Sequence, residues 1–521
     1  MITIFLSVTC YNVTMLTTNY YNDFFEFGQQ KINFSFFELS LPDDDPVYTL
    51  KKVMEELDFS GLLANCSDKG RTGYNPIMMY AVVTYANMRG IRSVDRIVDL
   101  CERDLAFIWL TRGQKPKRDA FYDFKNRKLT SDILDDLNYQ FMRRLQKEGL
   151  VTLKELFIDG TKIEANANRY TFVWRGSINY HLAGLLDSID QLFEKYNSFL
   201  QENDYGTKYE LGNAQMFVIE GMDKVREVIE KNRKRKLVKH KKLSNNRIIE
   251  IDNCSPLEIR KLQNNLTMIA DNEGIEFVYG KGKRKPALQQ LHEELEQCGK
   301  RLMEYKECFE IMGKDRNSYS KTDLEATFMR MKEDAMMNGQ LKPAYNLQHG
   351  VDSEYITWID ISAKPTDTGT LIPFLKDMEK HLSFRYQEIV ADAGYESEEN
   401  YLFLEKNGQS SFIKPMNYEI SKTRKYKKDI GKMENMEYDP EKDSYRCQNR
   451  KMLTVQYQRK QKTATGYLRT VTVYQCHECK GCPFKEKCIK GNNCKTPMEK
   501  REKRLYVSKV MKQKREENVK R

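Results

Sequence analysis

The sequence predicts a protein of the α+β or mixed α/β class, in which an all-helical domain precedes a sheet that a long helical segment interrupts. Three observations predict it. Residues 46–150 carry apolar side chains at helical spacing. Short apolar runs typical of buried strands occur at 156–160, 345–361 and 388–395. Between the first run and the others, residues 181–315 are polar and helix-forming. Strand, strand, helix and strand in succession are typical of a mixed sheet.

Composition bounds the class of protein. The chain has 521 residues, of which 40% are hydrophobic and 31% charged, so it is neither disordered nor membrane-embedded on average. It has no apolar stretch of about 18 residues, which is the length that a membrane span needs. The apolar start at residues 1–8 lacks the basic flank of a secretory signal. The 12 cysteines form no spaced disulfide framework, which favours the reducing cytoplasm.

The net charge indicates a class of partner. At +11 with both signs abundant, it suits a protein that meets a polyanion over part of its surface, and nucleic acid is the usual one. A soluble protein with many lysines would have a similar charge, so the charge alone does not decide.

Residues 1–45 are expected to be an N-terminal extension, and residues 46–150 a helical domain. Pro76 suits a first helical position, Gly90 ends the apolar run that follows, and Ser93 can cap the next helix. Two short helices joined by a glycine turn resemble a helix-turn-helix unit, although most such pairs are ordinary packing. A basic cluster follows at Lys115, Lys117, Arg118, Lys125, Arg127 and Lys128. We therefore expect this domain to read DNA, with Lys115, Lys117 and Arg118 in contact with it.

The helical segment 181–315 contains two basic runs. The second is Lys281–Lys285, and the first comprises Lys231, Arg233, Lys234, Arg235, Lys236, Lys239, Lys241 and Lys242. This composition fits a solvated helical insertion and fits equally a clamp on DNA phosphates. Under the second interpretation, Arg233, Lys234, Arg235 and Lys236 bind DNA.

Two aspartates share one local pattern: an apolar strand, the acid, and a glycine at once or one residue later. They are Asp159, before Gly160, and Asp392, before Ala393 and Gly394. Two such strands side by side would bring both carboxylates to one end of a sheet, where ligands collect in α/β folds. Paired oxygen ligands suit Mg²⁺ or Mn²⁺, and two such ions can hold the attacking and leaving oxygens of a phosphodiester. Aspartate and glycine at a strand end are also a common turn element, and the pattern alone leaves both interpretations open.

Four motifs follow one another in order along the chain. They are FIDGTKIEANANRYTFVW at 157–174, TDLEA at 322–326, YNLQ at 345–348 and ADAGY at 391–395. Together they resemble the motifs of bacterial insertion-sequence transposases of the DDE type. The resemblance runs from about residue 46 to the C-terminus. The wide spacing between the two aspartates is similar to that of members with a helical insertion in an RNase H-like core.

The resemblance implies a fold and a function. The RNase H-like core would comprise residues 151–180 and 316–430, with 181–315 as its insertion, and Asp159 and Asp392 would be catalytic residues that bind Mg²⁺ or Mn²⁺. Asp323 is expected near a turn, outside the site. The implied partner is double-stranded DNA, both as transposon ends held by the helical domain and as target, and the implied activity is metal-dependent strand cleavage and transfer. Such enzymes usually act as dimers across two ends.

One expected motif was not found. Family members complete a catalytic triad with a glutamate on a helix, in a motif similar to R-x-x-E-V-E before Phe-Gly, and this chain has none. Residues 499–521 are expected to form a basic helix, on which Glu499, Glu502, Glu516 and Glu517 form ion pairs. We therefore expect a C-terminally truncated transposase. A catalytically inactive DNA-binding derivative and a metal-dependent nuclease on the same core are the alternatives.

A cysteine-rich segment spans residues 431–498, with Cys447 and Cys494 beside a tight cluster of Cys476, Cys479, Cys482 and Cys488. Thiolates at this spacing can surround Zn²⁺ tetrahedrally, iron–sulfur ligation is the rival, and unused cysteines are the third alternative. The resemblance favours a structural zinc knuckle held by the four clustered cysteines, in which Cys447 could replace one. His477, between two of them, is expected to be exposed.

Overall fold

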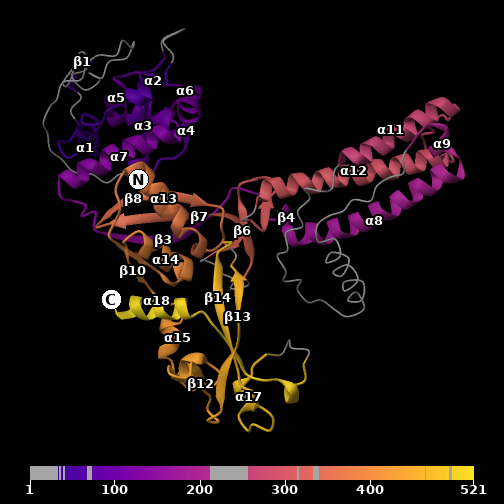
Figure 1. The fold of residues 1–521 in the computed structure, drawn as a ribbon. Helices are drawn as coiled ribbons and strands as arrows, with labels where there is room; N and C mark the ends of the chain where they lie inside the picture. Colours follow the sequence, from indigo (N-terminus) through magenta and orange to yellow (C-terminus); the bar gives the residue numbers. More distant parts are fainter. Residues whose placement is uncertain are drawn as a thin grey trace. The chain divides into compact units, whose positions relative to one another are not determined.

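The computed structural model describes residues 33–34, 37–38, 41–66, 73–211, 256–313, 316–331, 339–463, 465–491 and 496–520. The chain divides into two compact units (Figure 1). Unit 1 comprises Met1–Gly160, Leu347–Asp360 and Thr366–Arg521, and unit 2 comprises Thr161–Asn346 and Ile361–Pro365. The basic run that includes Arg233, Lys234, Arg235 and Lys236 lies outside the described residues, as does most of the expected N-terminal extension.

The first part of unit 1 is helical, as predicted. After a short antiparallel pair, β1 (Asn33–Phe34) and β2 (Phe37–Glu38), come α1 (Pro46–Met54), α2 (Ser60–Ala64), α3 (Pro76–Met88), α4 (Val94–Arg103), α5 (Leu105–Thr111), α6 (Arg118–Asp123), the π-helical turn η1 (Phe124–Lys128) and α7 (Ser131–Lys147).

The predicted helix signals hold. Pro76 is the first residue of α3, whose N-cap Asn75 accepts hydrogen bonds from the next amides, and Gly90 follows the helix at φ 71°. The side chain of Ser93 caps α4. Helix α3 is buried on nearly every side, so it forms the centre of this helical part.

The sheet of unit 1 follows α7. Its strands and the elements between them are β3 (Glu155–Glu164), β7 (Leu341–Asp352), β8 (Tyr355–Ser362), the turn η2 (Asp367–Gly369), α13 (Leu371–Leu382), β9 (Glu388–Ala391), the turn η3 (Ala393–Tyr395), α14 (Glu398–Lys406) and β10 (Ser410–Ile413). The strand order is β10-β9-β3-β7, and β8 also pairs with β7. The β10–β9 and β9–β3 pairs are parallel. Helices together with this sheet confirm the mixed class that the sequence predicts.

Helix α13 covers the sheet with an apolar face. Phe374, Leu375 and Met378 are fully buried in one core with Leu156 of β3 and Ile389 of β9. Contact is close enough that a Cβ on Gly350 of β7 would lie 3.0 Å from both Leu156 and Phe374. The two parallel strands are therefore held in register by packing as well as by their hydrogen bonds.

A second sheet, all antiparallel, occupies the C-terminal part of unit 1. Its order is β11-β12-β13-β14-β15. The elements are α15 (Tyr418–Lys422), α16 (Arg424–Lys427), η4 (Met433–Asn435), β11 (Glu437–Asp439), β12 (Ser444–Arg446), β13 (Met452–Lys462), β14 (Leu468–Gln475), α17 (Lys485–Cys488), η5 (Met498–Lys500), β15 (Arg504–Val507) and α18 (Lys509–Lys520).

Residues 499–521 do not form the single helix that the sequence suggested. Leu505 and Val507 are buried while Arg504 and Tyr506 are exposed, and this alternation places them in β15 beside β14. Helix α18 begins only at Lys509. Its Asn518 exchanges two hydrogen bonds with the backbone of Ile413, which satisfies part of the free edge of β10.

Unit 2 contains long helices, and most of their residues fall in the segment 181–315. Its elements are β4 (Phe172–Trp174), α8 (Arg175–Glu202), α9 (Tyr205–Lys208), α11 (Pro256–Glu273), α12 (Ala287–Met312), β5 (Ser318–Ser320) and β6 (Thr327–Arg330). Leucines and isoleucines of α8, α11 and α12 share one core. β4 pairs with β5, and β6 pairs with the first residues of β7. Asp323 lies in a turn, where it accepts hydrogen bonds from the Glu325 amide and the Tyr345 hydroxyl. No helix in the described part of either unit is long and apolar enough to cross a membrane.

Candidate active site

The parallel pairing of β3 with β9 brings two predicted site residues together. Ile158 pairs with Ala391, and the next residue of each strand is Asp159 or Asp392. Both aspartates are exposed. The carboxylates therefore lie at neighbouring positions beside the end of β9, as the shared pattern suggested. The expectation that both strands end at the acid is wrong for Asp159, because β3 continues to Glu164.

Each of the two aspartates is held over a glycine amide. The Gly160 N–H donates to Asp159 Oδ1 at 2.8 Å, and the Gly394 N–H donates to Asp392 Oδ1 at 2.8 Å. A hydrogen bond from a backbone amide fixes the direction of a carboxylate. The sequence pattern of an acid and a nearby glycine thus has a local structural cause at both positions, within β3 for Asp159 and directly after β9 for Asp392.

The same glycines admit a third carboxylate, that of Asp367 in the turn before α13. A Cβ at Gly160 would lie 2.8 Å from Asp367 Oδ1 and 2.7 Å from Gln348 Nε2. At Gly394, a Cβ would lie 3.0 Å from both Asp367 Oδ2 and Asp392 Oδ1. The distance between Asp367 Oδ2 and Asp392 Oδ1 is therefore at most twice 3.0 Å. A side chain at either glycine would displace this part of the site.

Gln348, which is fully buried in β7, organises the inner side of the site. Its Nε2 donates to Asp367 Oδ1 at 3.3 Å, and its Oε1 accepts from the Thr370 hydroxyl at 2.9 Å and from the Tyr395 hydroxyl. Burial, with the negative charges of Asp367, Asp392 and Asp159, raises the pKa of Tyr395 far above its usual value. The phenol thus stays protonated and acts as a donor.

Three of these residues had no role in the sequence-based prediction. Gln348 and Tyr395 lie in the YNLQ and ADAGY motifs, so a signal was present, but their side chains were not assigned. Asp367 follows no apolar strand, and nothing in its local sequence distinguishes it from other loop acids. Only the approach of β3, β7 and the turn before α13 identifies it.

Three of the predicted DNA-binding residues lie in and just before α6: Arg118 is its first residue, and Lys115 and Lys117 precede it. Lys117 and Arg118 have side chains that are 75% and 60% exposed. Their ion pairs, with Glu102 at 3.8 Å and Asp95 at 3.5 Å, are long and solvent-exposed, hence weak. The Lys115 carbonyl accepts a hydrogen bond from the Tyr74 hydroxyl, which ties this loop to the start of α3. The three residues therefore form one exposed basic edge of the helical part.

The structure gathers the cysteines of the C-terminal part around one pocket. Five cysteines line it: Cys447, Cys476, Cys479, Cys482 and Cys488. Lys503 and Phe484 are among its other lining residues. Cys494 lies outside the described residues, and His477 is exposed, as predicted. Burial and the neighbouring thiols raise the pKa of Cys476 to about 12. The Lys503 amide donates to Cys479 Sγ at 3.4 Å.

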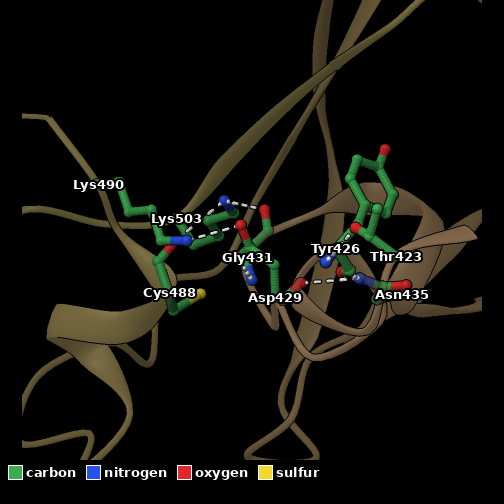
Figure 2. Close-up of polar contacts among 8 residues, drawn as sticks. All are labelled: Thr423, Tyr426, Asp429, Gly431, Asn435, Cys488, Lys490 and Lys503. Atoms are coloured by element: carbon green, nitrogen blue, oxygen red, sulfur yellow. Dashed lines mark hydrogen bonds and ion pairs between the residues drawn. The ribbon is translucent and has the colours of Figure 1, made fainter. Parts of the chain in front are cut away.

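Lys503 connects this pocket to the segment 423–435. Its ammonium donates to the carbonyls of Gly431 at 2.7 Å and Cys488 at 3.2 Å (Figure 2). Asp429 adds a second link, since it accepts from Lys490 at 2.6 Å. Gly431 lies so close to Cys488 that a Cβ would be 2.6 Å from its carbonyl oxygen. The Lys503 ammonium therefore forms part of the wall of the cysteine pocket. Burial raises the pKa of the Cys488 thiol, and this positive charge opposes that rise.

Within the described ranges, no group of three or more His, Cys, Asp or Glu side chains is positioned to hold a metal ion. The carboxylates and the thiols are nevertheless donor atoms that two different classes of metal prefer. Carboxylate oxygens at the end of β9 suit Mg²⁺ or Mn²⁺. The thiols suit Zn²⁺, but they would first have to lose their protons.

Comparison with known families agrees with this geometry. A family described as a transposase domain (DUF772) matches residues 35–127, and a transposase DDE domain matches residues 316–510. The second match contains Asp392, Asp367 and the cysteine pocket, whereas Asp159 lies between the two matched ranges. No curated protein and no solved structure gave a match. The two domains, in this order, place the chain among the DDE transposases of insertion sequences.

Proposed function

We propose that the chain binds transposon ends and cleaves and transfers DNA strands at Asp159 and Asp392, within an RNase H-like core. The observation that carries the proposal is the pairing of Ile158 with Ala391, which brings two solvent-exposed carboxylates to neighbouring positions. Exposure matters because a phosphodiester in duplex DNA is bulky and can reach only an open carboxylate pair.

Each residue of the site would have a different role. Asp159 and Asp392 would hold Mg²⁺ or Mn²⁺, which when bound activates water or a 3′-hydroxyl and neutralises charge on the phosphodiester. The amides of Gly160 and Gly394 orient the two carboxylates. Gln348 holds one oxygen of Asp367, and the other oxygen is left near Asp392. Asp367 thereby adds negative charge beside the pair.

DNA recognition would use the helical part. Lys115, Lys117 and Arg118 present an exposed basic edge, and cationic side chains of this kind contact phosphates without reading sequence. Two transposon ends require two copies of the site, so we propose a homodimer, which light scattering with and without end DNA can measure.

At the cysteine pocket we propose a structural zinc ion. Cys476, Cys479, Cys482 and Cys488, with Cys447 as a substitute for one, supply more thiols than the four that Zn²⁺ takes. Two measurements test this. Elemental analysis of the purified chain should find about one zinc per chain, and visible absorption would instead identify an iron–sulfur cluster.

The central experiment is an assay of Mg²⁺-dependent cleavage on DNA that carries the terminal repeats, with gel-shift binding measured on the same samples. Cleavage that requires Mg²⁺ and both aspartates supports the proposal. Binding without cleavage would contradict it and identify a DNA-binding derivative without catalysis. Cleavage that survives Asp159→Asn and Asp392→Asn would show that the chemistry lies elsewhere.

A further inference from the structure

The sheet β13-β14-β15 has one face that the hydrophobic core does not use. On the inner face, Leu453, Tyr474, Leu505 and Val507 pack in one buried cluster. A register shift between Val455 and Tyr457 turns Tyr457 and Arg459 of β13 to the opposite face, named here the open face. Strand pairing gives the residues of this face: Thr454, Tyr457, Arg459, Val471, Val473, Gln475, Arg504 and Tyr506. Those on β13 and β15 are exposed, and the valines between them on β14 are buried.

Two tyrosine rings lie in one row across the open face. Tyr457 pairs with Val473, and Val473 pairs with Tyr506, so both rings project from the same side of the sheet. They are 48% and 55% exposed. Two strands apart, their backbones are roughly 10 Å from each other. A large aromatic ring left this exposed loses the stabilisation that burial would provide, so a pair of them in register indicates a ligand.

The charge around these rings is positive. The Arg459 guanidinium lies over the Tyr506 ring, 5.1 Å from its centroid. Arg504 donates to Gln475, and Arg469, beyond Arg459 on the same side, donates to Gln461. Both partners are neutral amides, and no carboxylate among the described residues forms an ion pair with any of the three arginines. Their charges therefore remain available to an anion.

The position of this hairpin connects it with the acidic site. Near its turn, the Tyr467 hydroxyl donates to Glu398 at 2.9 Å, and Glu398 begins the helix α14 that follows the Asp392–Tyr395 loop. Ser508, directly after β15, also donates to Glu398. The open face is thus carried by a hairpin whose turn lies beside this loop. At its other end, β14 is followed directly by Cys476, which lines the cysteine pocket.

We propose that the open face binds single-stranded DNA, with one base stacked on each of Tyr457 and Tyr506 and with the backbone held by the arginines. Flat sheet faces with exposed rings and cations bind unpaired bases in this way, because every base has a stacking face whereas bases within a duplex are already stacked. The source of the strand rests on the proposed function, since strand cleavage at the nearby site would free such an end. The binding itself does not depend on it.

The test compares single-stranded and duplex DNA. Fluorescence anisotropy of a labelled oligothymidylate of about 20 nucleotides would be measured with the full chain in EDTA. The double variant Tyr457→Ala with Tyr506→Ala should weaken binding about tenfold or more, since each stacked base contributes substantially. Tyr457→Phe with Tyr506→Phe keeps the rings and should remain within about twofold. Tyr180→Ala, at an exposed ring of α8 in unit 2, is the matched control and should have no effect.

Each outcome decides. The proposal is wrong if the double alanine variant binds the oligothymidylate as tightly as the wild type does. It is also wrong if the double phenylalanine variant loses as much affinity as the alanine variant, or if the alanine variant loses as much affinity for duplex DNA as for the oligothymidylate. If the alanine variant instead alters sedimentation of the free chain, the face binds a second copy and the proposal is again wrong. Circular dichroism of all variants checks that they fold. The wild-type chain could also fail to cleave DNA while the double alanine variant loses single-strand binding. That result would support this inference and contradict the proposed function.

Discussion

Arg515 of α18 forms a two-pronged ion pair with the fully buried carboxylate of Glu396, at 2.6 and 2.8 Å. The same carboxylate accepts from the Tyr401 hydroxyl and the Met416 amide. Glu396 directly follows the Asp392–Tyr395 loop. The last helix therefore supports the loop that carries one of the candidate catalytic residues.

Removal of Arg515 should destabilise the fold. Arg515→Ala leaves the Glu396 carboxylate buried without its cation, and we expect a loss of about 3–5 kcal/mol in the free energy of unfolding. Urea denaturation measures it. Lys520→Ala, at an exposed position of the same helix, should change stability by less than about 0.5 kcal/mol. Equal stability of the two variants would mean that α18 is not seated on Glu396.

Substitution at Gly160 should damage the candidate active site without unfolding the protein. The Cβ of Gly160→Ala would meet Gln348 and Asp367 below 3.0 Å, and overpacking of this kind costs about 1–3 kcal/mol. Strand cleavage should fall strongly, because the carboxylates shift. Gly176→Ala is the control, since a Cβ there meets nothing within 4 Å. Undiminished strand cleavage by the Gly160→Ala variant would contradict the close approach of Asp367.

Three carboxylate variants separate the roles in the site. Asp159→Asn and Asp392→Asn should each lower Mg²⁺-dependent nicking by about a hundredfold or more, while gel-shift affinity for end DNA changes little. Asp367→Asn keeps the hydrogen bond to Gln348 possible and removes one charge, so we expect a smaller loss that higher Mg²⁺ concentration partly restores. A loss as complete as that of Asp392→Asn, with no rescue, would contradict this auxiliary role.

Alkaline pH should weaken the helical part through Cys101 of α4. Burial, with Glu102 and Asp104 nearby, raises the pKa of Cys101 to about 12 from the ordinary value of 9.0. The folded state thus binds the thiol proton more tightly than the unfolded state, so its contribution is present below pH 9 and lost as pH rises towards 12. Cys101→Ala should be less stable than the wild type at pH 7, by about 1 kcal/mol.

The stability difference between those two proteins should narrow at high pH. Urea titrations at neutral pH and at about pH 10 would measure it, since the variant has no thiol to ionise. A constant difference would mean that the thiol ionises as readily in the folded state as in the unfolded chain.

Lys503 should control the cysteine pocket. Lys503→Met removes the bonds to Gly431 and Cys488 and removes the cation beside the thiols. If zinc binds there, the variant should lose it to a chelator faster than the wild type, because ligand thiolates are harder to form. Lys442→Met, exposed and outside the lining of the pocket, is the control. Identical zinc release in both would argue against Lys503 as part of the site.

Local patterns in the sequence were sufficient for much of this protein. The starts of α3 and α4, the helical insertion, and the strands before Asp159 and Asp392 could all be predicted, because caps and apolar periodicity act between residues near in sequence. The Cys476–Cys488 cluster was visible for the same reason.

Tertiary structure alone decided what meets across long separations. The approach of Asp367 and Gln348 to Gly160, the addition of Cys447 to the cysteine pocket and the row of Tyr457 and Tyr506 all depend on which strands pair and in which register. Register is set by the packing of whole faces against a core, and no short stretch of sequence encodes it. For the same reason Leu505 and Val507 form a strand in a segment whose composition favours a helix: the inner face of β14 buries them.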